Sequence, residues 1–130
     1  MLSQAHPAAS LYLWVGGSAF LVLFGLPLLI VPITWARLFR WWIPDDERLA
    51  RYLGRSLGAV VVPLMGVLLR AAPTPERFPW LFELSAAVCA LLMLVHVVGA
   101  VERSQPWTET VEIGVYALVG GLAFWIRTTL

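Results

Sequence analysis

The stretch LYLWVGGSAFLVLFGLPLLIVPI, residues 11–33, holds 23 consecutive residues without a charged side chain. A helix needs about 20 mostly apolar residues to cross the hydrocarbon core of a bilayer. We therefore predict a membrane-spanning helix here, retained because the apolar run is too long for a signal peptide and no basic segment precedes it. Pro27 and Pro32 lack a backbone N–H, so we expect them to kink or end this helix. A membrane tolerates such prolines where neighbouring groups satisfy the freed carbonyls.

The composition extends this conclusion to the whole chain. Of 130 residues, 60% are hydrophobic and 13% are charged, whereas soluble domains are about half apolar and about a quarter charged. We predict a single integral membrane domain over residues 1–130. The formal net charge of +1 creates no field that would attract nucleic acid or an acidic substrate. The one cysteine, Cys89, lies in an apolar run and is interpreted as a small buried side chain.

Three further spans are expected, at residues 49–72, 78–101 and 107–127. The uncharged part of the second, 56–69, is only 14 residues long. It can cross only if Arg51 and Arg55 lie in its first turns with their charged ends reaching the membrane surface. The links 73–77 and 102–106 are short, so consecutive helices should pack antiparallel. The predicted fold class is all-α, a four-helix transmembrane bundle.

The segment 34–48, between the first two spans, is rich in side chains that favour the lipid headgroup region. These are Trp35, Arg37, Arg40, Trp41 and Trp42. We predict a short interfacial helix in this segment. Asp45 is the predicted N-cap of the helix that follows.

The arginines predict the orientation, because basic residues accumulate in cytoplasmic loops. One side carries six: Arg37, Arg40, Arg48, Arg51, Arg55 and Arg103. The other carries three: Arg70, Arg77 and Arg127. We therefore expect a multi-pass protein of the cell's inner (plasma) membrane with both termini on the non-cytoplasmic side.

Small and polar residues gather in stripes at helical spacing on spans two, three and four. On span two the stripe is Arg51, Arg55, Gly58 and Val62, beside a Gly54-x-x-x-Gly58 pattern. On span three it is Ser85, Cys89, His96, Ala100 and Arg103. On span four it is Glu109, Glu112, Tyr116, Gly120, Ala123 and Arg127. Helices associate in lipid through such residues, so the stripes should face one another.

The ionisable members of these stripes all lie near the predicted cytoplasmic surface. The candidate ligand-binding or proton-relay residues are Arg51, Arg55, His96, Glu109, Glu112 and Tyr116. One interpretation is a structural clasp, in which Arg55 pairs with Glu112 or Glu109 and His96 donates a hydrogen bond. The other is a pocket or proton relay that opens to the cytoplasm, since ionisable residues inside membranes commonly mark function.

The sequence carries no recognisable catalytic set. It has no glycine-rich phosphate loop, no His-Glu-x-x-His helix and no Gly-x-Ser-x-Gly elbow. Intramembrane haem needs two axial histidines, and only His96 falls within a span, because His6 lies near the other side. We predict no catalytic residues, no metal site and no cofactor.

The start of the second span, Arg51-Tyr52-Leu53-Gly54-Arg55-Ser56-Leu57-Gly58, resembles the DoxX-like small four-helix membrane proteins of bacteria. The resemblance covers about a fifth of the chain. It implies a bacterial membrane protein, with redox-linked or accessory roles, and names no reaction.

Two main functions follow as hypotheses. The first is a non-catalytic accessory subunit or self-associating scaffold, a homo-oligomer or part of a larger membrane complex. The second is a small transporter or a membrane protein that binds a ligand such as a quinone at the polar cluster. A membrane enzyme acting on a lipid-soluble substrate is a third alternative.

Overall fold

The computed structural model describes residues 2–130, and within that range the chain forms helices and no strand. Four helices are long and apolar enough to cross a membrane: Pro7–Ile30, Arg48–Ala71, Trp80–Glu102 and Trp107–Thr129. The prediction of an all-α chain with four long apolar helices is therefore confirmed, with ends shifted by a few residues. The chain divides into two compact units, Met1–Pro75 and Glu76–Leu130.

The first span of the N-terminal unit is built from three consecutive pieces. They are α1 (Pro7–Phe20), a π-helical turn (Leu21–Gly25) and α2 (Leu26–Ile30). The chain leaves helical geometry at Val31, directly before Pro32, and restarts as α3 (Pro32–Leu38). The predicted disruption at both prolines is thus present, as a wide turn before Pro27 and as a break before Pro32.

The disruption at Pro27 leaves the carbonyl oxygen of Leu23 without its usual helical partner. In an α-helix that oxygen would accept the N–H of residue 27, and proline has none. The indole Nε1–H of Trp35 donates to the Leu23 oxygen instead, at 2.7 Å. The Trp35 ring also stacks on Phe39 with 4.5 Å between centroids, and Phe24 lies 5.6 Å from it. These contacts fold α3 back against the end of the first span.

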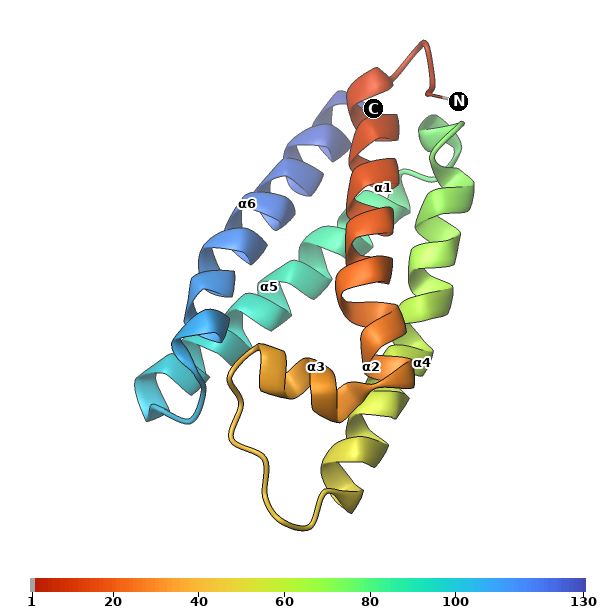
Figure 1. The fold of residues 1–130 in the computed structure, drawn as a ribbon. Coiled ribbons are helices and arrows are strands. Elements are labelled where there is room, and N and C mark those ends of the chain that lie inside the picture. Colours follow the sequence, from red (N-terminus) through yellow and green to blue (C-terminus); the bar gives the residue numbers. More distant parts are fainter. Residues whose placement is uncertain (1) are drawn as a thin grey trace. The chain divides into compact units, whose positions relative to one another are not determined.

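The fourth helix of this unit, α4 (Arg48–Ala71), lies beside α1, α2 and α3 (Figure 1). Two glycines of the predicted Gly-x-x-x-Gly pattern form its closest contacts. A Cβ atom at Gly54 would lie 2.5 Å from Cβ of Pro32, and one at Gly58 would lie 2.4 Å from the backbone N of Leu29. Only glycine allows this approach, as in other closely packed membrane helices. Gly58, assigned to the stripe expected to face spans three and four, therefore packs on the first span.

The N-cap of α4 lies two residues after the predicted one. Asp45 was the predicted N-cap, but the helix begins at Arg48 with Glu47 in the cap position. It is Asp46 whose carboxylate accepts the backbone N–H of Arg48, at 3.1 Å, together with the Arg48 guanidinium. These hydrogen bonds hold the pKa of Asp46 below its usual range. The hydrogen bond from the Arg48 guanidinium has the larger effect, and the one from the Arg48 backbone N–H has the smaller. Asp46 thus bonds to the backbone two residues further on, as aspartates commonly do just before a helix, while Glu47 in the cap position makes no side-chain cap hydrogen bond.

The C-terminal unit is an antiparallel pair of helices, α5 (Trp80–Glu102) and α6 (Trp107–Thr129) (Figure 1). A short 3₁₀ turn, Pro75–Arg77, precedes it. In the middle of the pair Gly120 approaches Cys89 so closely that an added Cβ would lie 2.9 Å from that of the cysteine. Cys89 is buried here, as its apolar surroundings predicted. The small residues of the two predicted stripes thus form the contact between α5 and α6.

Candidate functional site

A tight turn between α5 and α6 places the candidate site. Arg103 ends α5 in the left-handed conformation, φ 55°, and the Ser104 N–H returns to the Gly99 carbonyl at 2.9 Å. This is the arrangement that commonly satisfies the last carbonyls of a helix. The side-chain amide of Gln105 donates to the His96 carbonyl at 3.0 Å. The turn therefore holds the last turns of α5 opposite the first turns of α6.

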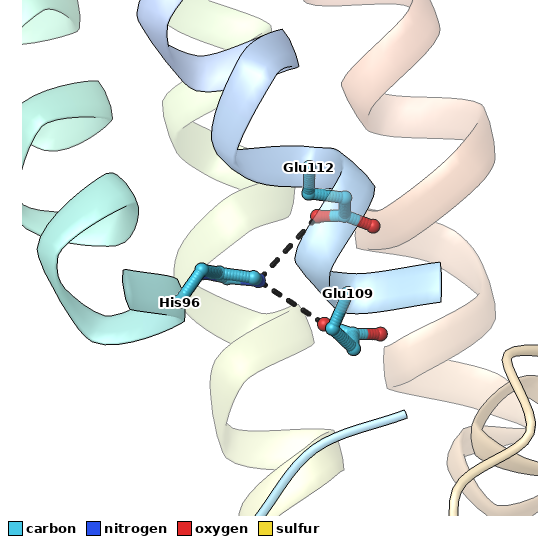
Figure 2. A group of neighbouring side chains, drawn as sticks. All are labelled: His96, Glu109 and Glu112. Atoms are coloured by element: carbon cyan, nitrogen blue, oxygen red, sulfur yellow. Dashed lines mark hydrogen bonds and ion pairs between the residues drawn. The ribbon is translucent and has the colours of Figure 1, made fainter. Parts of the chain in front are cut away.

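Three ionisable side chains meet at this end of the pair, as Figure 2 shows: His96 from α5, and Glu109 and Glu112 from α6. His96 Nε2 lies 3.1 Å from Oε2 of Glu109 and 3.7 Å from Oε2 of Glu112. The side chains of His96 and Glu109 are only 10% and 8% exposed. We call these three residues with Tyr116 the polar cluster.

Tyr116 supports the cluster from the next turn of α6. Its hydroxyl donates to Oε2 of Glu112 at 2.8 Å, and its ring lies 5.1 Å from the imidazole of His96. The hydroxyl therefore orients one carboxylate while the ring packs against the imidazole. Tyr116 itself is buried.

The contact of Nδ1 shows which ring nitrogen of a neutral His96 carries the hydrogen. Nδ1 lies 2.7 Å from the backbone oxygen of Leu92. A carbonyl oxygen can only accept, so Nδ1 carries the hydrogen. In a neutral imidazole Nε2 is then a bare lone pair, and it faces carboxylate oxygens that are also acceptors. A hydrogen held between Nε2 and a carboxylate oxygen would turn this contact of two acceptors into a hydrogen bond.

The structure brings together four of the six residues expected at the site, His96, Glu109, Glu112 and Tyr116. His96 was expected to donate to a carboxylate or a carbonyl, and its ring nitrogens lie against Glu109, Glu112 and the Leu92 carbonyl. Arg55 is an exposed residue of α4, in the N-terminal unit. Arg51 binds Glu47 at 2.6 Å. The inclusion of these two arginines in the site remains a prediction.

Sequence reasoning missed two features of this unit. One is the ion pair between Glu83 and Arg127 at the opposite end of the helix pair, which the antiparallel pairing of the two stripes could have indicated. The other is that His96, Glu109 and Glu112 offer three potential metal-binding atoms, all within 4.8 Å of one another. The sequence signal for this set of donors was the pair Glu109 and Glu112, three residues apart on one span, which a short link joins to the span that carries His96.

Comparison with family models, curated proteins and solved structures finds no match to this chain, so the function rests on the fold and on the polar cluster.

Proposed function

We propose that this chain is a multi-pass inner-membrane protein, with both termini outside the cytoplasm, that binds a cation at the polar cluster. In the simplest case the cation is a proton. The observation that carries the proposal is the pair of carboxylates facing the Nε2 lone pair of His96, whose Nδ1 is committed to a backbone carbonyl.

Electrostatics supports a bound cation. Two ionised glutamates beside a neutral His96 would place two like charges close together in a largely buried place. Burial disfavours ionised carboxyl groups, and like charges at this distance repel each other. One proton shared between Nε2 and a carboxylate removes one of these charges and joins two groups that otherwise repel. The N-terminus of α6, where both glutamates lie, stabilises the remaining negative charge.

The depth of the cluster supports exchange of that cation with water. His96 lies six residues before the end of α5, Glu102, which is about 9 Å along a helix axis. Glu109 and Glu112 lie in the opening turns of α6. The cation therefore needs to travel only a short way from one membrane surface, which the arginine distribution assigns to the cytoplasm.

A purely structural clasp, or an accessory subunit that uses the cluster only to hold two helices, would need no exchange. The cation-binding proposal predicts that the occupancy of the cluster changes with conditions at the membrane surface. This difference gives the test.

The experiment is nitrogen-15 NMR of histidine-labelled protein in lipid bilayers. The chain has two histidines, so His6→Gln leaves His96 as the single signal. We expect Nδ1 to carry a hydrogen and Nε2 to have the chemical shift of a nitrogen that shares a proton with a carboxylate, a shift that Glu109→Gln should change. That shared proton should exchange for deuterium when the bilayers are placed in deuterated water. The exposed Glu102→Gln is the matched control and should leave both results unchanged. An Nε2 with the chemical shift of a free lone pair, or an Nδ1 without a hydrogen, would contradict the proposal.

A further inference from the structure

We propose that the polar cluster is a binding site for a divalent transition-metal ion, with Nε2 of His96 and one carboxylate oxygen each from Glu109 and Glu112 as ligands. This inference rests on the proposed function, because it names a second cation for the same site. It differs from it in chemistry, since a metal needs three donors directed at one point, whereas a proton needs two.

The spacing of the three donors suits a single ion. Nε2 lies 3.1 Å from the nearer oxygen of Glu109 and 3.7 Å from that of Glu112. Ligands bound to zinc at about 2.1 Å in a tetrahedron lie roughly 3.4 Å apart. The complete set already falls within 4.8 Å, so rotation of a carboxylate closes the remaining gap. Both glutamates come from neighbouring turns of α6, where spacing by three residues places them on one face.

The surrounding hydrogen bonds are those that metal-binding side chains use. A histidine ligand usually donates its second ring N–H to a carbonyl or carboxylate, which aims the bare nitrogen at the metal. Here Nδ1 of His96 donates to the Leu92 oxygen at 2.7 Å. Ligating carboxylates are held in turn by donors, and Tyr116 donates to Glu112 at 2.8 Å. The cluster thus has oriented ligands before any ion binds.

Charge and donor type select the class of metal. Two carboxylates and a neutral imidazole favour a divalent cation. One nitrogen and two oxygen donors suit zinc, iron(II), cobalt(II) or manganese(II), whereas calcium and magnesium prefer oxygen alone. Three protein ligands leave at least one coordination position for water or for a bound molecule.

Metal binding must displace the proton that the cluster holds. The ion takes the Nε2 lone pair, and the proton shared between Nε2 and a carboxylate passes to solvent. The balance is one divalent ion bound and about one proton released per site. No electron is transferred and no covalent bond of the protein changes.

The test is titration of metal-free protein, purified in detergent, with cobalt(II) and with zinc(II). Calorimetry in buffers of different ionisation enthalpy reports the stoichiometry and the protons released. We expect one ion per chain and about one proton released. His96→Gln and Glu112→Gln should abolish binding, and Tyr116→Phe should weaken it by about 10–100-fold through the lost hydrogen bond to Glu112. His6→Gln and the exposed Glu102→Gln are the controls and should bind like the natural chain.

A second measurement does not depend on whether the ligand variants fold. In the His6→Gln protein, pulsed electron paramagnetic resonance of bound manganese(II) should detect coupling to a histidine nitrogen, which can come only from His96. Absence of saturable binding, or bound metal without this coupling, would overturn the inference. If Nε2 still shares an exchangeable proton with a carboxylate in that case, only the metal is rejected; loss of both rejects the cation site itself.

Discussion

Replacing Gly58 by alanine should separate α4 from the first span. The added Cβ would lie 2.4 Å from the backbone N of Leu29 and 2.7 Å from its Cα, where ordinary contacts are about 3.5–4.0 Å. The obstructing atoms are backbone, so no side-chain rotation relieves the overlap, and the two helices must move apart by about 1 Å. Overpacking of this kind costs about 1–3 kcal/mol.

The same helix supplies a matched control. A Cβ at Gly66 would meet no atom within 4 Å. Both substitutions add the same helix propensity, about 0.5–1 kcal/mol in favour of alanine. The difference in unfolding free energy between Gly58→Ala and Gly66→Ala therefore isolates the overlap with Leu29, and we expect about 1–3 kcal/mol.

The assay is reversible unfolding in mixed micelles, in which the fraction of denaturing detergent is raised while circular dichroism and tryptophan fluorescence are followed. Gly66→Ala should match or exceed the natural protein, and Gly58→Ala should unfold at a lower detergent fraction. Equal midpoints for the two variants would show that Gly58 does not sit in a close helix contact, and the packing of α2 on α4 would have to be redrawn.

Three other changes test the remaining contacts by the same unfolding measurement. Gly120→Ala should destabilise the α5–α6 pair by about 1–3 kcal/mol, because its Cβ would lie 2.9 Å from that of the facing cysteine; Gly121→Ala, with open space around it, should cost nothing. Trp35→Phe removes the N–H that serves the Leu23 carbonyl and should cost about 1–3 kcal/mol, and an unchanged midpoint would mean that another donor replaces it. Arg103→Gly relieves a left-handed backbone and should stabilise by up to about 1 kcal/mol; a loss of stability would contradict the assigned turn.

The four spans could be predicted because length and charge alone decide them. Twenty or so apolar residues have few alternatives to a membrane helix, and each expected span falls on one of the four long helices. The ends of the first span were predicted less accurately than its centre. The helix begins at Pro7 and not at residue 11, and a separate helix, α3, begins at Pro32. A proline is well suited to the first turn of a helix, where its missing N–H is not needed.

The candidate site was predictable to the level of helix faces. Spacing along α5 and α6 was enough to place His96 near Glu109, Glu112 and Tyr116. It could not show that Nδ1 of His96 binds a backbone carbonyl, because that depends on a side-chain rotamer. That hydrogen bond leaves Nε2 as the nitrogen that faces the two glutamates, whereas the pairing of Arg55 with a glutamate stays a prediction.

The hydrogen bond between Trp35 and Leu23 has a consequence for where the chain can be interrupted. It joins a carbonyl that precedes Pro27 to an indole that lies beyond the break at Val31. An epitope tag or linker inserted between residues 31 and 35 would separate the donor from its acceptor and should destabilise the first helix, whereas one placed in the polar link before α4 should be tolerated.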